Sequence, residues 1–433
     1  MDYDVSVIGL GRVGLPLALC FAEAGLRVLC VDKDGDRLAT LRAGRMPFAE
    51  PGADALLARV MNRLVLSDRA TDAAQAESIV LTVGTPTFSH IEIDMGDLRS
   101  VLDDLLPLLV VGQLVVLRST VAPGPTEFVA GYLEKHRGFA VGEDIFVAHV
   151  PERIAAARFL EEIGTLPCIV GGVGSGSSAR AAALFEVFGA PIVQSTSVQA
   201  ELAKIWANIL RYATFALPNL LMMDCERYGA NVFEVIELVN RDYPRGGIAP
   251  PGFTAGTCLR KDFAFSEERS SAPGMLLAVS RVNESVPSFL VDGVKRRVGD
   301  GGSLREKKIA VLGLAFKQDT DDERDSLSHK LIRLLERELA DVAVHDPLVS
   351  TPTQDFDQAV TDADVVIVAT NHSVYSTPAG LARVLELCAP DAVVVDPWNA
   401  FGSAQVFAYG PEIRVLSSGP SVPRAPLRGS SAT

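Results

Sequence analysis

The 433-residue sequence has few of the residues that build a disulfide or metal framework. Its cysteines show no CxxC spacing, no cluster of metal ligands accompanies them, and they lie at Cys20, Cys30, Cys168, Cys225, Cys258 and Cys388. Such scattered thiols are typical of a reduced, cytosolic protein rather than of a secreted disulfide scaffold. We therefore expect a cytoplasmic location, no structural disulfide and no metal site.

Long apolar runs and clustered positive charge are also missing. The longest apolar run, residues 105–117, is interrupted by Pro107 and Gln113, and it falls short of the ~20 residues that a membrane span needs. The acidic opening Met1-Asp2-Tyr3-Asp4 lacks the basic region of a signal peptide. The net charge is −14, which argues against nucleic-acid binding. The sequence thus predicts a soluble protein with neither a membrane nor a nucleic-acid partner.

What the chain does have is enough length and apolar content for about two or three domains. Hydrophobic residues make up 48% and charged residues 22% of the sequence, as in ordinary globular proteins. Strand-like runs alternate with helical stretches, and the first of these runs are residues 4–8, 27–31, 78–83, 114–117, 145–149 and 168–170. This alternation predicts a doubly wound α/β fold.

A glycine-rich turn follows the first predicted strand. The motif Gly9-Leu10-Gly11-Arg12-Val13-Gly14 lies between that strand and a helical pattern at 15–24, and Asp32 ends the next strand. Such glycines let the backbone approach a pyrophosphate at a helix N-terminus, and the acidic residue accepts hydrogen bonds from the adenine ribose. We therefore expect NAD rather than NADP, although Lys33 leaves some room for NADP. The alternative is a structural turn that binds nothing.

Three of the predicted strands end in polar loops. The candidate ligand-binding residues in them are Gly84, Thr85 and Pro86 after the first strand, Ser119 and Thr120 after the second, and Glu152 and Arg153 after the third. Ligands bind at the carboxyl ends of parallel strands, so Thr85 and Thr120 either reach the nicotinamide ribose or a catalytic water, or simply form turns. Glu152 is either a proton-handling group or a carboxylate favoured at a helix start.

A long helix and a cysteine loop follow. Residues 196–227 form one helical pattern, far longer than the ~11–12-residue average, which suggests a spine between two lobes or a dimer seam. On it, Lys204 and Asn208 project from one face and either stabilise an oxyanion or are merely solvated. The stretch from Gly256 to Asp262 sets Cys258 beside a Lys-Asp pair, so this thiol is either a nucleophile or a small buried hydrophobe.

A second α/β unit opens with a strand at 307–314. Further strands are predicted at 342–345, 365–369 and 392–395. This unit lacks GxGxxG, so we do not expect it to bind a dinucleotide in the same way. Lys317 and Arg324 would instead serve an anionic ligand such as a diphosphate. The tail from Ser417 is rich in Ser, Pro, Gly and Arg and is expected to be disordered.

Seven motifs together resemble the UDP-sugar 6-dehydrogenases, the family of UDP-glucose and UDP-N-acetylhexosamine dehydrogenases. In order along residues 1 to about 400, they are GLGRVGLPLA from Gly9, VGTP from Val83, STVAPG from Ser119, PERIA from Pro151, ELAKIWAN from Glu201, GTCLRKD from Gly256 and GLAFKQDTDDERDS from Gly313. The resemblance implies two Rossmann-like doubly wound domains joined by a long central helix and a small helical domain. The implied ranges are 1–195 for NAD binding, 196–300 for the central helical, dimerisation and cysteine-bearing part, 301–416 for UDP binding, and 417–433 for the tail.

The resemblance also implies the reaction. Two NAD molecules would oxidise the C6 hydroxyl of a UDP-sugar to a carboxylate, giving a uronic acid for polysaccharide biosynthesis. An alcohol cannot reach the acid by hydride loss alone, and Cys258 would capture the aldehyde as a thiohemiacetal that becomes a thioester. By similarity the catalytic residues are Cys258, Lys204, Asn208, Asp262, Glu152 and Thr120. Substrate contacts would come from Glu152, Arg153, Lys204, Asn208, Gly256, Phe316, Lys317 and Arg324, with Arg245 reaching across a homodimer.

The sequence departs from the family pattern at three places. Thr254 and Ala255 stand where the cysteine loop usually has glycine, Ala156 replaces a second carboxylate, and Trp398 replaces a small or basic residue. The PERIA motif resembles the UDP-N-acetylmannosamine/glucosamine branch, whereas Lys261-Asp262 resembles the glucose-type enzymes, so the sugar stays open. Alternatives are a GDP-mannose-type dehydrogenase, a catalytically silent nucleotide-binding relative, and a simple 3-hydroxyacid dehydrogenase.

Overall fold

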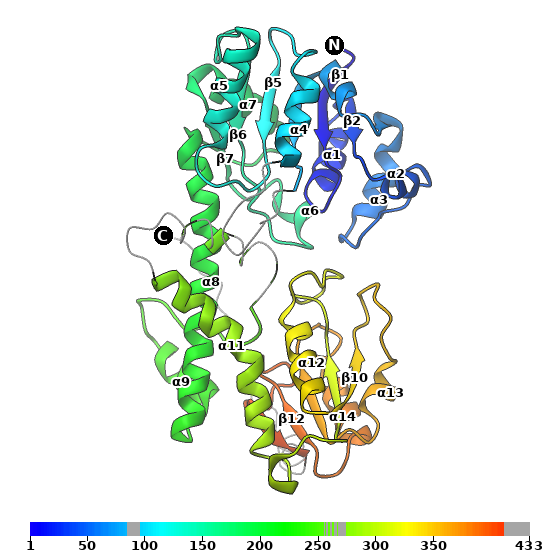
Figure 1. Ribbon diagram of the computed structural model, residues 1–433, viewed down its shortest axis with the longest axis vertical. Coiled ribbons are helices and arrows are strands. Elements are labelled where there is room, and N and C mark those ends of the chain that lie inside the picture. Colours follow the sequence, from blue (N-terminus) through cyan, green and yellow to red (C-terminus); the bar gives the residue numbers. More distant parts are fainter. Residues whose placement is uncertain are drawn as a thin grey trace. The chain divides into compact units, whose positions relative to one another are not determined.

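The protein folds into two compact α/β units (Figure 1). The computed structural model describes residues 1–84, 96–254, 256, 259, 262, 263, 266 and 274–410. Met1–Ala213 and Thr257–Ser280 form the first unit, and Thr214–Gly256 and Arg281–Thr433 form the second. Helix α8 (Ser197–Tyr228) begins in the first unit and ends in the second.

The first unit contains an eight-stranded sheet. Its strands are β1 (Tyr3–Ile8), β2 (Val28–Val31), β3 (Leu64–Ser67), β4 (Ala76–Leu81), β5 (Leu114–Leu117), β6 (Phe146–His149), β7 (Cys168–Gly172) and β8 (Ile192–Thr196). The order is β3-β2-β1-β4-β5-β6-β7-β8. Neighbouring strands are parallel except for β6 and β7, which pair antiparallel. The first six strands thus have the Rossmann order, whose switch point between β1 and β4 is where dinucleotides bind.

Helices cover both faces of this sheet, so neighbouring residues of each central strand are buried in two different cores. Val116 of β5 packs in one core and Val115 in the other. A strand that is buried on both faces has a continuous apolar sequence, and this is why β5 and its neighbours could be predicted from the sequence. The helices described wholly within this unit are α1 (Gly14–Glu23), α2 (Gly35–Arg42), α3 (Ala53–Val60), α4 (Gly96–Leu105), α5 (Pro125–Arg137), α6 (Phe159–Glu162) and α7 (Gly174–Phe185).

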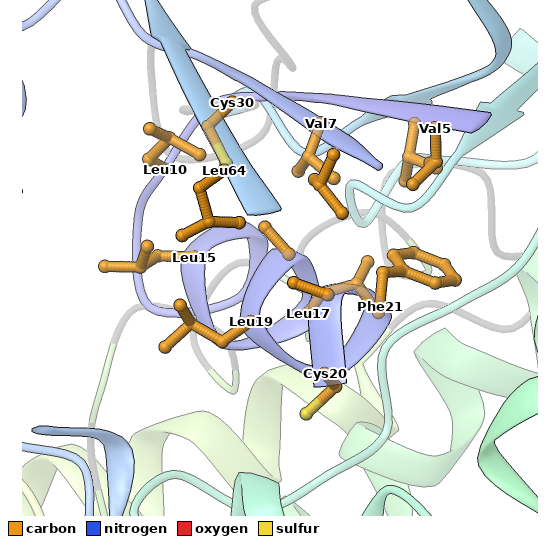
Figure 2. Close-up of a cluster of buried hydrophobic side chains, with 14 of the residues drawn as sticks. Val5, Val7, Leu10, Leu15, Leu17, Leu19, Cys20, Phe21, Cys30 and Leu64 are labelled. Carbon is orange, nitrogen blue, oxygen red and sulfur yellow. The ribbon is translucent and has the colours of Figure 1, made fainter. Parts of the chain in front are cut away.

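Helix α1 lies against β1 and β2 with nearly its whole length buried. In Figure 2, Leu17 and Phe21 of α1 lie on the side of the helix that faces Val5 and Val7, whereas Cys20 points away from these strands. Burying a side chain of this size contributes roughly 1.5–3 kcal/mol. The packing therefore holds the N-terminus of α1 directly behind β1.

The second unit has a five-stranded sheet of its own. Its strands are β9 (Lys308–Leu312), β10 (Asp341–His345), β11 (Val365–Val368), β12 (Val393–Val395) and β13 (Phe407–Tyr409), in the order β10-β9-β11-β12-β13. All neighbours are parallel except β12 and β13. The helices described wholly within this unit are α9 (Val232–Asn240), α12 (Leu327–Arg337), α13 (Phe356–Val360) and α14 (Pro378–Leu387). Helix α11 (Met275–Lys295) begins in the first unit and ends in the second.

The predicted fold class, two doubly wound Rossmann-like units with a long intervening helix, is confirmed. Strands β3, β8 and β13 were not predicted. β8 is an edge strand whose residues are half-buried or exposed, so it has no apolar run, and β13 has three residues only. The predicted domain boundaries stay a prediction, and the tail 417–433 lies outside the described residues. Within the described part of the chain, no helix is long and apolar enough to span a bilayer.

Candidate active site

The glycine turn after β1 forms a cradle at the N-terminus of α1. Gly9 has φ +95°, a left-handed conformation that glycine adopts without strain. A Cβ atom on Gly14 would lie 1.9 Å from the carbonyl oxygen of Gly9, so this glycine lets helix and strand approach closely. A Cβ on Gly11 would meet nothing within 4 Å. Gly11 therefore borders open space where a pyrophosphate can approach the backbone.

Asp32 lies where the dinucleotide motif requires an acid, at the end of β2. It is buried, and its carboxylate accepts hydrogen bonds from the Leu10 N–H at 2.6 Å and the Asp34 N–H at 2.9 Å. Arg37 Nη1 on α2 pairs with Asp32 Oδ2 at 2.7 Å. Lys33 is instead exposed and pairs with Asp97 at 3.1 Å. The cradle thus fits a dinucleotide, and Arg37 is an additional charged group at its edge that the sequence analysis did not single out.

The other predicted cofactor residues surround this cradle or follow neighbouring strands. Val13 immediately precedes α1, and the Arg12 guanidinium lies 5.1 Å from the centre of the Phe48 ring. Ser119 Oγ donates to the Val83 carbonyl at 2.6 Å, which ties the loop after β5 to the loop after β4. Thr120 is half-buried in the first of these loops and Gly84 is exposed in the second. Thr85 and Pro86 lie outside the described residues.

Glu152, predicted from the loop after β6, is one half of a buried ion pair. Arg118 Nη2 lies 2.5 Å from Glu152 Oε2, and Oε1 accepts from the Ile154 N–H at 2.6 Å. The Arg118 side chain is 3% exposed and lies 5.1 Å from the Phe185 ring centre. Arg153 donates to the Pro167 carbonyl. Glu152 is therefore a held, ion-paired carboxylate, and its partner Arg118 was not predicted.

His149 at the end of β6 is a second buried group beside this pair. Neither ring nitrogen has a hydrogen-bond partner among the described residues. Burial, helped by the positive charges of Arg118 and Lys204, lowers the pKa of His149 to about 3, and the nearby Leu117 carbonyl acts in the opposite direction. His149 is therefore neutral in the folded protein at any pH near 7.

This depressed pKa predicts acid destabilisation. The folded protein excludes the proton that an unfolded histidine takes up below pH 6.5, so stability is complete above that pH and falls as the pH drops toward 3. At pH 5 the loss from this residue is about 2 kcal/mol. Urea unfolding at pH 7.5 and pH 5 should show that His149→Leu loses less stability on acidification than the wild type by this amount. Equal losses in the two proteins would contradict the assignment.

Helix α8 carries two predicted catalytic residues of the first unit, Lys204 and Asn208. Asn208 Nδ2 donates to Asp262 Oδ2 at 2.5 Å, and Asp262 is fully buried. Lys204 and Asn208 are half-buried and one turn apart. The aromatic rings of Tyr212 and Phe263 are 5.9 Å apart and help pack the segment around Asp262 against α8. Asn208 and Asp262, predicted separately, are thus direct neighbours. Cys258 lies outside the described residues.

Comparison with known proteins decides the family. Three models of the UDP-glucose/GDP-mannose dehydrogenase family match in succession: its NAD binding domain at residues 3–189, its central domain at 198–285 and its UDP binding domain at 310–403. The UDP-N-acetyl-D-mannosamine dehydrogenase of Pyrococcus horikoshii is 32% identical over 375 residues, covering 85% of this chain and 89% of that protein. The chain belongs to the UDP-glucose/GDP-mannose dehydrogenase family. The predicted resemblance is therefore confirmed.

Other members are similarly related. The NDP-N-acetyl-D-galactosaminuronic acid dehydrogenase of Ralstonia nicotianae is 31% identical over 388 residues, covering 85% of this chain and 90% of that protein. The solved structure of UDP-D-ManNAc dehydrogenase from Pyrococcus horikoshii has a TM-score of 0.84 at 30% identity and covers 92% of this chain and 96% of that one. Among UDP-sugar dehydrogenases, this chain is thus similar to enzymes named for different N-acetylhexosamines.

In this family member, the loop before the cysteine is held within the second unit by glycine–aromatic contacts. A Cβ on Gly252 would lie 2.3 Å from the Trp398 ring, and one on Gly256 would lie 2.7 Å from the Phe316 ring. Gly256 has φ +100°, and the Gly252 N–H donates to Asn219 Oδ1 at 2.9 Å. Trp398, noted as a departure from the family pattern, therefore fills space directly over Gly252.

The departure at Thr254 has a structural counterpart. Thr254 is buried and its hydroxyl has no hydrogen-bond partner among the described residues. Ala255 lies outside those residues. A buried hydroxyl without a partner costs free energy, so Thr254 is not explained by the packing of the described residues.

The charged residues predicted for an anionic ligand have different settings. Arg324 forms a two-contact pair with Asp322, at 2.8 Å and 2.7 Å, so a carboxylate of its own loop already compensates it. Arg245 is exposed and lies 5.5 Å from the Tyr243 ring centre. Lys317 is half-buried. The structure thus brings Gly256 and Phe316 together.

The second unit repeats the acid-at-strand-end arrangement of the first. Gly313 after β9 has φ +98°, and the Leu314 N–H donates to Asp346 Oδ2 at 2.6 Å. His372 Nε2 lies 3.1 Å from the same oxygen. Burial alone would raise the pKa of Asp346, but these hydrogen bonds and those from Ala315 and Leu348 hold it well below its usual range. Asp346 is therefore a fully occupied structural carboxylate.

Proposed function

We propose that this chain is a four-electron UDP-sugar 6-dehydrogenase, which oxidises the C6 hydroxyl of a UDP-N-acetylhexosamine or UDP-glucose to a carboxylate with two NAD. The observation that carries the proposal is the Asn208–Asp262 contact. It joins the helix of Lys204 to the GTCLRKD segment, in the same unit as the dinucleotide cradle. A simple alcohol dehydrogenase has no need of this segment.

The residues have distinct roles in this proposal. Bound NAD would supply the hydride acceptor for each of the two oxidations. Cys258 would add through its sulfur to the aldehyde carbon, and loss of the second hydride would leave a thioester, which water cleaves to the acid and the free thiol. Lys204 and Asn208 would stabilise the charged oxygen. Asp262, held by Asn208, Glu152, held by Arg118, and Thr120 would handle protons and position water.

We propose that residues of several sequence motifs bind the sugar nucleotide. The UDP binding domain model over 310–403 supports a UDP-linked substrate. We assign Phe316 and Gly256 to the substrate loop, and Lys317 and Arg324 to its phosphate or sugar region. Arg153 and Arg245 complete the set. The Pro151-Glu152-Arg153 motif and the relatives named above favour an N-acetylhexosamine over glucose.

Product stoichiometry tests this function. With a saturating sugar, absorbance of NADH should show two NADH per sugar consumed, and the product should be the acid. The panel is UDP-glucose, UDP-GlcNAc, UDP-ManNAc, UDP-GalNAc and GDP-mannose. Cys258→Ala is the negative control. This variant should bind NAD but form no acid. One NADH per sugar with a ketone product would refute the proposal, and activity on GDP-mannose alone would move the enzyme to the GDP-sugar class.

We also propose a homodimer that uses an exposed face of α8. Its apolar residues recur at three-, four- and seven-residue spacing, and they are Val198, Leu202, Trp206, Leu210, Leu217 and Leu220. Trp206 is 54% and Leu210 66% exposed, and a contiguous apolar stripe of this kind marks an interaction site. In a twofold dimer the same face of both copies would meet, so apolar side chains of α8 would pack on apolar side chains of its counterpart. Light scattering that gave a monomer mass at assay concentration would contradict it.

We place the enzyme in the cytoplasm and in the supply of uronic acids for polysaccharide biosynthesis. The support is chemical: the five described cysteines are all free thiols, as a reducing compartment would keep them. The sixth, Cys258, must also stay reduced for the proposed chemistry.

A further inference from the structure

Glu201 on α8 is a fully buried carboxylate that none of the steps above uses. Its Oε2 accepts from the Gly124 N–H at 2.8 Å. Its Oε1 accepts from the Thr126 N–H at 3.0 Å and from the Thr126 hydroxyl at 2.5 Å. Three donors at the N-terminus of α5 thus compensate the buried charge, and such charge-assisted bonds are short and strong. The contact fixes one point of α8 to the start of α5.

The two segments that meet at Glu201 carry proposed catalytic residues. Lys204 and Asn208 follow Glu201 by three and seven residues, which puts all three on neighbouring positions of one helix face. Gly124 ends the STVAPG loop that begins with Ser119 and Thr120. Ala122 of that loop packs in one small buried cluster with Ile205 and Ile209 of α8. The loop and the helix therefore meet along two turns of α8.

We propose that Glu201 is a positioning residue, which sets the register between the Lys204 and Asn208 side chains and the Ser119–Gly124 loop. This inference rests on the proposed function. A carboxylate is required because both of its oxygens accept hydrogen bonds. An amide of the same shape has one acceptor oxygen, so it would have to point its NH₂ group at a backbone N–H. The loop would then shift, and displacement by about 1 Å can cost 10²-fold in rate.

A hydrogen bond at the same helix junction supplies a control. Ser197 Oγ donates to Glu127 Oε1 at 2.6 Å, and it also joins the start of α8 to the first turn of α5. Glu127 is exposed, and neither residue lies on the loop or has a proposed catalytic role. A Ser197→Ala change therefore weakens the junction without disturbing the acceptor geometry at Gly124 and Thr126.

The test compares Glu201→Gln, Thr126→Val and Ser197→Ala in the full-length protein. Glu201→Gln should lower kcat by about 10- to 100-fold with KM for the UDP-sugar and Kd for NAD little changed. Thr126→Val keeps both backbone bonds and should cause a smaller fall, which keeps the inference testable if Glu201→Gln folds poorly. Ser197→Ala should retain wild-type kcat. Hydrogen–deuterium exchange should show faster exchange at Gly124 and Thr126 in Glu201→Gln.

Two results would overturn the inference. One is a wild-type kcat in a folded Glu201→Gln variant. The other is equal loss of kcat in Glu201→Gln and Ser197→Ala at equal loss of Tm, which is what a purely structural junction would give. Failure of the proposed function is seen separately, as absence of NADH production by the wild-type protein. In that case the exchange measurement still shows whether Glu201 holds the loop.

Discussion

Replacing Gly14 by alanine should abolish measurable NAD binding and lower the thermal stability of the protein. The added Cβ would lie 1.9 Å from the Gly9 carbonyl oxygen and 2.3 Å from Thr82 Oγ1. That carbonyl already accepts a 2.5 Å hydrogen bond from Thr82 Oγ1. Because backbone atoms cannot move aside as a flexible side chain can, α1 must shift away from β1. The shift opens the core that α1 shares with Val5 and Val7.

Gly11→Ala is the matched control for this change. A Cβ there meets nothing within 4 Å, so the fold and Tm should be unchanged. The methyl group would instead occupy the space through which a pyrophosphate approaches the backbone, and we expect about 10- to 100-fold weaker NAD binding, equivalent to about 1.4–2.8 kcal/mol. Calorimetric titration with NAD and a thermal melt distinguish the two variants. Wild-type affinity and Tm in Gly14→Ala would show that the turn is not so tightly packed.

The parts of the site that sequence predicted are those written in one local stretch. The glycines of the cradle lie within six residues, and Asp32 follows a strand that is apolar throughout. Local patterns of this kind can be recognised from neighbouring residues, without knowledge of the tertiary contacts. The pairing of Arg324 with Asp322 is equally local, since the two residues are two positions apart. It was not predicted, because a positive residue type does not by itself show whether a neighbouring carboxylate compensates its charge.

The missed contacts join residues that are far apart in sequence. Arg118 meets Glu152 only because β5 and β6 lie side by side in the sheet, and Glu201 meets Thr126 across 75 residues. The spacing of these residues along the sequence does not predict that they form pairs. Asn208 and Asp262 were each predicted by their motifs, yet their contact depends on how the segment around Phe263 packs on α8. Tertiary packing, rather than residue type, decides which charges are compensated.

Replacing Arg118 by leucine should lower the free energy of unfolding by about 3–5 kcal/mol, because it leaves the Glu152 carboxylate buried without its cation. The double change Arg118→Leu with Glu152→Leu should recover most of this loss, since a buried pair replaced by apolar side chains is often near neutral. Urea unfolding followed by circular dichroism gives both values. The coupling energy of the pair is the effect of the double change minus the sum of the effects of the two single changes.

The exposed pair between Arg27 and Asp4 shows what burial contributes. Its geometry is similar, with Arg27 Nη2 at 2.9 Å from Asp4 Oδ1, but the Arg27 side chain is 60% exposed. Water screens such a pair, so Arg27→Leu should cost much less stability than Arg118→Leu. If Arg118→Leu cost no more than Arg27→Leu, the Arg118–Glu152 pair would not be isolated from water. Water would then solvate the Glu152 carboxylate in the absence of Arg118. That result would contradict the proposal that Arg118 is needed to hold Glu152 near the reacting sugar.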